Sequence, residues 1–346
     1  MRFAGQSLKH AAPVATALAL WLVTGAPTTG GVLTSPAMQS PSPGARLGHA
    51  LSYVDDSGRV LLFGGFLSDG QPRDDLWAWD GRTWRELSGP GPSPRRWPAM
   101  TYDRGRRRLI LHGGRTGVGA QGRQLDDTWQ WDASGWRLLT ASGPGGRDHH
   151  RMTYDASRDR IVLFGGWDGD STRSDTWELQ DDQWRRVASG GPSARAAHGL
   201  TYDPQRERTL LYGGSADTVF FGDTWLWDGR AWTAVAGPAP PSRSFHGMAF
   251  DRGRALVVVA GGRRGTTLYG DTWAFDGARW TQAPDTTLPA RYVYDLAYDE
   301  RRRELVFHGG GFMREGRWTL FAETWAWRAG AWRAAGRDGR ESRGMP

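Results

Sequence analysis

The stretch I-V-L-F-G-G occupies residues 161–166, and close variants of it occur five more times along the chain. The second glycine of each copy stands at 65, 114, 166, 214, 262 and 310, so neighbouring copies are 48 to 52 residues apart. The residues before each glycine pair are apolar at consecutive positions, which indicates a strand that is covered on both faces. A fixed period of this length predicts a repeat architecture in which each copy forms one structural unit.

Aromatic residues recur at fixed distances from each glycine pair. An acid-x-Trp element follows the pair, and a second tryptophan follows seven residues later, so that these two columns hold 12 of the 20 tryptophans. Another aromatic residue stands twelve positions before the second glycine in every copy. Each copy therefore indicates four strands: one leading to this aromatic, the apolar run, the acid-x-Trp segment, and the segment around the last tryptophan.

A four-stranded antiparallel unit that is covered on both faces must pack against copies of itself. Radial packing of six copies predicts an all-β, six-bladed β-propeller over residues 46–334, with repeats starting near 46, 95, 147, 195, 243 and 291. Residues 34–45 carry no tryptophan that matches the last column. We therefore predict no strand exchange between the first and the last blade.

Composition excludes several classes of function. The chain has 346 residues and no cysteine, so disulfides, thiol nucleophiles and cysteine-ligated metal sites are absent. The net charge of +7 suggests nucleic acid as a partner, but the basic residues are almost all arginines spread along the chain among aspartates. No helix-turn-helix or zinc-finger pattern is present, and we expect no nucleic-acid partner.

The N-terminus resembles a secretory signal. Basic residues precede an apolar run of 13 residues at 11–23, and T-G-A follows at 24–26. We predict a signal peptide over 1–30, with cleavage between 26 and 37, then a linker over 31–45 and a disordered tail over 335–346. Secretion, or a periplasmic or cell-surface location, without stable membrane insertion after cleavage, is the expectation. An uncleaved anchor is the alternative.

The pattern R-x-x-H…Y-D…G-G…D-T-W-x-W-D…W resembles the kelch-repeat β-propeller family, and more narrowly exported bacterial kelch proteins, which are galactose-oxidase-like. The resemblance covers residues 46–334. Copper oxidases of that type use a tyrosine crosslinked to cysteine, and a chain without cysteine cannot form that cofactor by that route. The resemblance is specific for the fold and says less about function, because propellers host many functions. No cofactor is predicted.

Two polar columns accompany the repeat. An arginine stands seven residues before the aromatic in all six copies, and the acid of acid-x-Trp also occurs six times. Equal numbers of arginines and acids predict ion pairs at the strand ends. The alternative is a ring of arginines that lines one mouth of the propeller and attracts anions, with Arg147, Arg195 and Arg243 as ligand-binding candidates. The kelch resemblance places these strand starts and the loops after Gly-Gly at the same mouth, so both interpretations can hold.

Residues that depart from the repeat are the candidates for function. Trp97, Trp167 and Trp318 lie at a strand start or in loops after Gly-Gly, and we predict that they bind ligand at this mouth. Exposed aromatic rings beside arginines and acids are typical of a sugar-binding surface. Packing between loops is the alternative role for these three rings.

The segment R-D-H-H-R at 147–151 contains two of the eight histidines. Arg147 and His150 belong to repeat columns, so Asp148, His149 and Arg151 are what is particular to this blade. As consecutive residues of a predicted strand, Asp148 and His149 should point to opposite faces. Asp148, His149 and Glu315 are the candidates for catalysis, since a carboxylate and a histidine can transfer protons.

Asp168 and Asp170 form a weakly calcium-like pair without the later ligands of an EF-hand loop. We predict no metal site and name these two only as candidates. The function we predict is an exported binding or interaction module, monomeric, whose mouth takes a carbohydrate or another extracellular ligand such as a protein. The alternative is a sugar-acting enzyme, oxidase-like or epimerase-like, that uses the same mouth without a Cys–Tyr copper cofactor.

Overall fold

A computed structural model describes residues 41–336, except 88, 142, 189 and 285–287. The predicted signal peptide (1–30), most of the predicted linker (31–45) and most of the predicted tail (335–346) lie outside the described residues. Among the residues that are described, no helix is long and apolar enough to cross a membrane.

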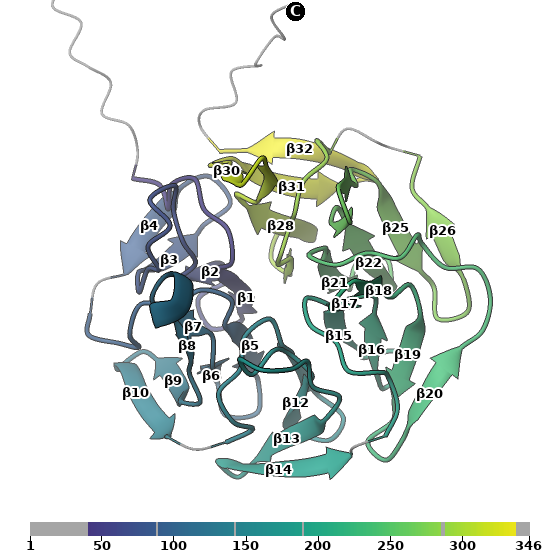
Figure 1. Ribbon diagram of the computed structural model, residues 1–346, viewed down its shortest axis with the longest axis horizontal. Coiled ribbons are helices and arrows are strands. Elements are labelled where there is room, and N and C mark those ends of the chain that lie inside the picture. The colour runs from purple at the N-terminus through teal and green to yellow at the C-terminus, as the bar shows by residue number, and fades with distance from the viewer. Residues whose placement is uncertain (1–40, 88, 142, 189, 285–287, 337–346) are drawn as a thin grey trace, which may run out of the picture. The chain divides into compact units, whose positions relative to one another are not determined.

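Six four-stranded antiparallel sheets form the blades of a propeller, which confirms the predicted fold (Figure 1). Blade 1 contains β1 (Ala50–Val54), β2 (Arg59–Phe63), β3 (Leu76–Trp79) and β4 (Trp84–Leu87). Blade 2 contains β5 (Ala99–Asp103), β6 (Arg108–His112), β9 (Thr128–Asp132) and β10 (Gly135–Thr140). Blade 3 contains β11 (Arg151–Asp155), β12 (Arg160–Phe164), β13 (Thr176–Gln180) and β14 (Gln183–Ala188).

The other three blades follow the same order. Blade 4 contains β15 (Gly199–Asp203), β16 (Arg208–Tyr212), β19 (Thr224–Trp227) and β20 (Trp232–Val235). Blade 5 contains β21 (Gly247–Asp251), β22 (Leu256–Ala260), β25 (Thr272–Phe275) and β26 (Trp280–Gln282). Blade 6 contains β27 (Ala297–Asp299), β28 (Glu304–His308), β31 (Thr324–Arg328) and β32 (Ala331–Ala335).

Each blade is built from one continuous segment of chain. The first strands, from β1 to β27, surround the central channel, and the fourth strands, from β4 to β32, form the rim (Figure 1). Blade 1 draws all four strands from residues 50–87, and blade 6 draws all four from 297–335. The prediction that no strand is exchanged between the first and last blades is therefore confirmed.

The last tryptophan column joins neighbouring blades. At five of the six joints the indole Nε1 donates a hydrogen bond of 2.8 to 3.0 Å to a threonine Oγ1 at the start of the preceding blade's third strand. The joint between blades 6 and 1 is one of these, with Trp84 bound to Thr324 at 2.8 Å. At the joint of blades 1 and 2 the position is Leu76, which has no hydroxyl to offer Trp136.

The glycine pairs stand where the backbone turns sharply and approaches a neighbouring segment. Gly166 has φ +101°, and a Cβ there would lie 2.7 Å from the Cβ of His150 and 2.8 Å from the carbonyl oxygen of Asp148. Only glycine can adopt this φ and this close approach to the neighbouring backbone without strain. The pair therefore fixes where the second strand ends and the loop begins.

Four of the loops after Gly-Gly form short hairpins. These are β7 (Arg115–Thr116) with β8 (Arg123–Gln124), β17 (Ser215–Ala216) with β18 (Val219–Phe220), β23 (Arg263–Arg264) with β24 (Thr267–Leu268), and β29 (Gly311–Arg314) with β30 (Arg317–Leu320). The first also holds the short 3-10 helix η1 (Gly119–Gln121). We call the end of the ring that carries these loops and the starts of the first strands the loop end, and the opposite end the turn end.

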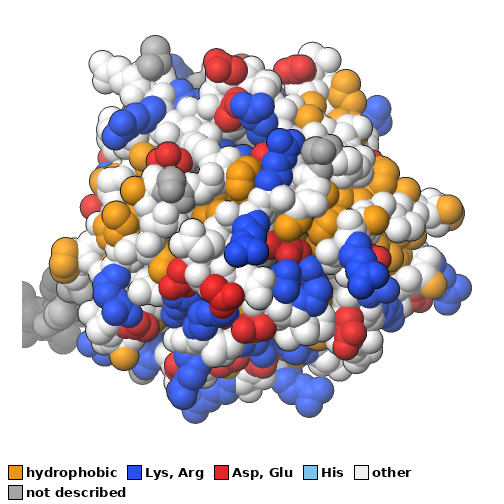
Figure 2. Space-filling view, turned by 90° about the horizontal axis from the view of Figure 1, so that it is seen from below, with side chains coloured by type: hydrophobic (Ala, Val, Ile, Leu, Met, Phe, Trp, Pro, Cys, Tyr) orange, Lys and Arg blue, Asp and Glu red, His pale blue; other side chains and the backbone are white. Residues whose placement is uncertain are grey.

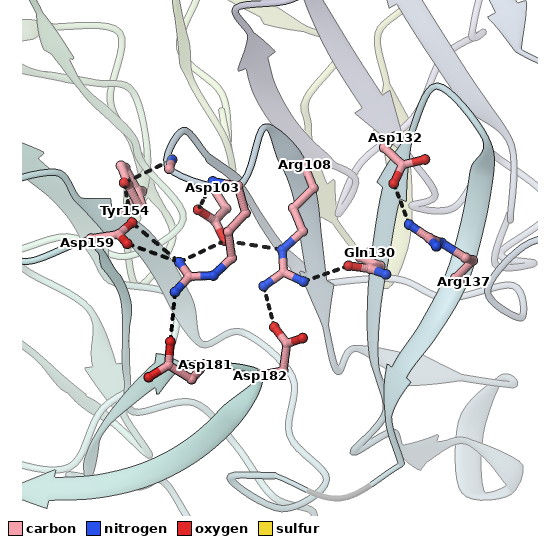
Figure 3. A network of polar contacts seen from close by, with 11 residues as sticks. Asp103, Arg108, Gln130, Asp132, Arg137, Tyr154, Asp159, Asp181 and Asp182 are labelled. Carbon is pink, nitrogen blue, oxygen red and sulfur yellow. Dashed lines mark hydrogen bonds and ion pairs between the residues drawn. The ribbon is translucent and has the colours of Figure 1, made fainter.

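The turn end is held together by ion pairs between arginines and acids. Arg108 on β6 donates to Asp103 at 3.2 Å and to Gln130 at 2.7 Å, and it also bonds Asp182 from blade 3 (Figure 3). Figure 2 views the ring from its side and shows arginines and acids close together over the lower part of that face. The positive charge is thus largely interleaved with acids, as the sequence indicates.

Candidate functional site

The six column arginines are structural. Their side chains are at most 3% exposed, and each guanidinium pairs with the acid of acid-x-Trp in its own blade. The N–O distances are 2.6 to 2.9 Å in five blades and 3.3 Å to Glu323 in blade 6. Each guanidinium also donates to the carbonyl oxygen of the first glycine of the pair, at 2.9 to 3.3 Å. The arginine therefore ties the start of the first strand to the end of the second.

These contacts lower the pKa of the five aspartates and so favour their charged form. Burial acts to raise the pKa of Asp175, but the hydrogen bond and charge of Arg147 and the indole N–H of Trp177 outweigh it, so the pKa is lowered. The same causes lower the pKa of the aspartates of blades 1, 2, 4 and 5. The sequence expectation of ion pairs at the strand ends thus matches the observed geometry.

Arg147, Arg195 and Arg243 were also candidates for ligand binding. The structure places their guanidinium groups inside the blades, where their donors already serve a carboxylate and backbone carbonyls. They do not line the mouth. These three arginines are therefore not part of the mouth.

Two of the three off-pattern tryptophans belong to one aromatic cluster at the loop end. Trp97 and Trp318 are both half-buried, and Phe66 lies between them, with ring centroids 5.9 Å and 5.5 Å away in edge-to-face arrangements. Tyr292 contacts Trp318 at 5.8 Å, and Phe245 stacks on Tyr292 at 5.4 Å. These rings pack against each other at the loop end; Phe66 and Tyr292 are buried, whereas Trp97, Trp318 and Phe245 are half-buried and form the exposed part of the mouth.

Trp167 lies apart from this cluster. It is half-buried, and its backbone exchanges hydrogen bonds of 2.8 and 2.9 Å with the backbone of Asp148. No ring contact joins Trp167 to Trp97 or Trp318 within the described residues. The structure thus brings Trp97 and Trp318 together and places Trp167 on the blade 3 side of the mouth.

The side chains of Asp148 and His149 contact each other, which corrects the expectation that they point to opposite faces. The two residues precede β11, and His149 has φ +54°, so the alternation of a strand does not apply to them. His149 Nδ1 lies 2.5 Å from Asp148 Oδ1, and Gln124 Nε2 donates to Asp148 Oδ2 at 3.1 Å. The imidazole stacks on Trp97 with centroids 4.1 Å apart, and its Nε2 is buried without a hydrogen-bond partner.

A ring of backbone hydrogen bonds explains the positive φ at this position. His149 N donates to Trp97 O at 3.2 Å, Ala197 N donates to His149 O at 2.9 Å, and Phe245 N donates to Ala197 O at 3.0 Å. Trp97, Ala197 and Phe245 also have φ between 53° and 58°. Each residue turns inward to bond the neighbouring blade, and its side chain is thereby directed over the channel.

The remaining candidates are separate from this pair. Glu315 lies in the exposed turn between β29 and β30 and makes no ion pair among the described residues. Asp168 accepts hydrogen bonds from the backbone N–H of Asp170 at 3.0 Å and of Ser171 at 2.8 Å, and it pairs with Arg173. Across the ranges that the structure covers, no group of three or more His, Cys, Asp or Glu side chains is arranged to hold a metal ion.

Two arginines flank the aromatic cluster from opposite sides of the ring. The Arg96 guanidinium, from blade 2, lies 4.6 Å from the ring centroid of Trp97 and 5.6 Å from that of Phe66. The Arg263 guanidinium, from blade 5, lies 5.4 Å from the Phe245 centroid and 5.6 Å from that of Tyr292. Neither has a carboxylate partner in the described part of the chain, and the Nε of each is buried without a hydrogen-bond partner.

Sequence reasoning singled out Arg151 but missed Asp295, with which it forms a charged pair in the channel. Three residues before the aromatic column, four blades have Ala50, Ala99, Gly199 and Gly247, whereas blades 3 and 6 have Arg151 and Asp295. The two meet across the axis, with Arg151 Nη1 3.6 Å from Asp295 Oδ1. Asp295 Oδ2 also accepts the backbone N–H of Leu51, at 2.8 Å. Comparing blades column by column, as was done for the arginines, would have found this pair.

Asp295 of this pair lines a chamber of about 160 Å³ that extends to the turn end. Burial raises the pKa of Asp295, although Arg151 acts in the opposite direction. Above the pair, Tyr294 packs on Arg151 with 4.2 Å between the guanidinium and the ring centroid. The channel is thus occupied by side chains between the chamber and the mouth.

Comparison with known proteins agrees with this architecture. Residues 82–236 match a family model described as the KLHDC2/KLHL20/DRC7 Kelch-repeats domain. A solved structure of YjhT superposes with a TM-score of 0.67 at 13% identity, covering 85% of this chain and 99% of the other, and this likeness shows the fold alone.

Two curated relatives match about a third of the chain. Dynein regulatory complex subunit 7 of Chlamydomonas reinhardtii is 34% identical over 130 residues, which is 35% of this chain and 11% of the relative. Tip elongation aberrant protein 1 of Schizosaccharomyces pombe is 33% identical over 122 residues, which is 33% of this chain and 10% of the relative. The chain thus spans about a tenth of the length of these two relatives.

With six blades and their Gly-Gly and tryptophan columns, the chain is a six-bladed β-propeller, and residues 82–236 of it match a kelch-repeat family model. A propeller of this type suggests a protein-interaction module. The rigid blades hold the loops, and the loops present the side chains that a partner would meet.

Proposed function

We propose that this chain is an exported binding module and that its mouth at the loop end recognises an acidic carbohydrate. The observation that carries the proposal is the placement of Arg96 and Arg263. Both guanidinium groups lie over aromatic rings at opposite sides of the mouth, and neither forms an ion pair within the described residues. Arg263 Nη1 donates to the carbonyl oxygen of Gly265 at 3.3 Å, and the remaining donors of the two guanidinium groups can bind a carboxylate.

The aromatic cluster supplies the second half of the recognition. Trp97 and Trp318 are half-buried, so each presents part of an indole to the solvent beside the arginines. An indole face packs against the C–H face of a pyranose ring, and the arginines then select sugars that carry an acid group. Export rests on the signal-like residues 1–30, which lie outside the described residues.

Calorimetric titration with an acidic oligosaccharide, such as an oligogalacturonate, tests the proposal against a neutral oligosaccharide of the same length. We expect binding of the acidic ligand, weakened by salt, and a loss of roughly tenfold or more in affinity for Arg96→Gln and for Arg263→Gln. Arg186→Gln is the matched control, because Arg186 is exposed on the rim strand β14. Equal affinity for both oligosaccharides, or an equal loss in the control, would contradict the proposal.

One observation favours the second candidate, a sugar-acting enzyme. Asp148 bonds Nδ1 of His149, and the buried Nε2 has no hydrogen-bond partner, so this nitrogen is the candidate proton acceptor next to the mouth. The test follows acidic sugars by proton NMR in the presence of the protein and of His149→Ala. Conversion that is lost in the variant while the sugar still binds would support the enzyme, and no conversion by either protein would reject it.

A further inference from the structure

Exposed apolar side chains gather on the hairpins of the loop end. The described residues include five large hydrophobic side chains that are exposed, and three of them lie on these hairpins: Val118 at 42%, Val219 at 54% and Met313 at 48%. They belong to blades 2, 4 and 6, which alternate around the ring. Single exposed hydrophobic residues are common on proteins, but three at one end, one on every second blade, indicate an interaction surface.

The same hairpins are positively charged. We call residues 115–124, 215–220, 263–268 and 311–320 the hairpin crown. The crown contains six arginines and two acids, Asp217 and Glu315. Four of the arginines, Arg123, Arg264, Arg314 and Arg317, are exposed, and none of these four forms an ion pair within the described residues. The crown therefore presents unneutralised charge next to apolar tips.

The geometry of the ring makes the crown a broad docking surface. Each hairpin begins directly after the second glycine of its blade, so all four leave the propeller at the same end. Figure 1, viewed along the ring axis, shows the hairpins of the crown arranged around the centre of the ring. A small ligand reaches one tip at a time, whereas an extended surface meets the tips on blades 2, 4 and 6 together.

We infer that the hairpin crown docks on an anionic lipid surface. The headgroup layer of such a surface offers phosphates, which arginine binds with two hydrogen bonds, and below them an apolar boundary that accepts valine and methionine side chains. Several basic residues near an anionic surface together with a few apolar side chains are what peripheral attachment requires. The chain then lies on the membrane and does not cross it.

This inference goes beyond the proposed function, because it rests on the exposed side chains of the crown. Arg96 and Arg263, which carry the saccharide proposal, are half-buried over aromatic rings, whereas Arg123, Arg264, Arg314 and Arg317 of the crown are exposed. The saccharide proposal and the membrane inference can therefore be refuted independently of each other. Arg96→Gln, which lies outside the crown, is expected to leave vesicle binding within about twofold of the original value.

Co-sedimentation with lipid vesicles tests the inference with the full chain. The probes are vesicles of phosphatidylcholine alone and of phosphatidylcholine with phosphatidylglycerol. We expect sedimentation with the phosphatidylglycerol vesicles only, falling at high salt. The double variants Arg264→Gln/Arg317→Gln and Val118→Asp/Met313→Asp should each weaken it roughly tenfold or more.

Leu138→Asp is the matched control, since Leu138 is 50% exposed but lies on the rim strand β10. It should sediment as the original chain does, and the thermal unfolding of every variant is recorded to show that the propeller is intact. Equal sedimentation with both vesicle types would overturn the inference, as would an equal loss in Leu138→Asp. Capture by an immobilised acidic protein without any binding to vesicles would overturn it too, in favour of a protein partner.

Discussion

Six buried histidines should make the stability of the propeller fall steeply between pH 7 and pH 5. His49, His150, His198 and His246 stand four residues before the aromatic column, and His112 and His308 precede their glycine pairs. All six side chains are fully buried. Burial is the first cause that lowers their pKa, which falls to about 3 for His112 and His308 and well below the usual value for the other four.

The sign follows from which state binds the proton. Below pH 6.5 the unfolded chain protonates its histidines, whereas the folded chain keeps these six neutral, so the free energy of unfolding falls as the pH falls. At pH 5.5 one histidine with an unfolded pKa of about 6.5 costs the folded state about 1.4 kcal/mol, and six cost about 8 kcal/mol. That amount is comparable to the whole stability of an ordinary domain, about 5 to 15 kcal/mol.

Urea unfolding followed by tryptophan fluorescence at closely spaced pH values measures this effect. We expect the free energy of unfolding to lose about 8 kcal/mol between pH 8 and pH 5.5, with an uptake of about five to six protons on unfolding at pH 5.5. His198→Gln should lower that uptake by about one proton. A free energy of unfolding at pH 5.5 within about 1 kcal/mol of its value at pH 8 would refute the reasoning.

Three further changes test the joints of the ring, each by urea denaturation. Asp295→Ala should lower the free energy of unfolding by about 2 to 3 kcal/mol, because it leaves Arg151 charged without its counter-ion in the channel. No change would mean that water solvates Arg151 as well as Asp295 does. Thr176→Val should cost about 1 kcal/mol, since it removes the 2.8 Å hydrogen bond from Trp232; a loss below about 0.3 kcal/mol would contradict a role at the joint. Gly166→Ala should lower the free energy of unfolding by more than about 2 kcal/mol, because φ is +101° and the new Cβ would clash with the carbonyl oxygen of Asp148. An unchanged free energy of unfolding would show that the loop can shift to make room.

Periodicity was sufficient to predict the fold. The double glycine and the two tryptophan columns recur at nearly constant spacing, so strand number, blade number and the absence of strand exchange followed from residue positions alone. The arginine column was also interpretable, because Arg195 and its five equivalents are matched in number by the acids that they bind. An interaction that every blade repeats can be predicted from the sequence, because the same residue types recur at the same spacing in all six copies.

The site was harder to predict, for two physical reasons. The pairing of Asp148 with His149 depends on a positive φ that an inter-blade hydrogen bond imposes, and residues other than glycine give no sign of that conformation in the sequence. Arg151 and Asp295 come from blades that face each other across the ring, so closure of the whole ring brings them together. The crown hairpins pair over only two to four residues per strand, too short for an alternating pattern to show.

The closure of the ring by the contact of Trp84 with Thr324 has a consequence for how this chain can be rearranged. Because each sheet comes from one uninterrupted segment, no sheet of the described residues combines strands of the first and the last blade. Cutting the chain at a linker between two blades and joining the original ends would therefore leave all six sheets whole. Circular permutants opened at different linkers should reach the same propeller, and the one opened between blades 1 and 2, where Leu76 offers no hydroxyl, should lose the least stability at its cut.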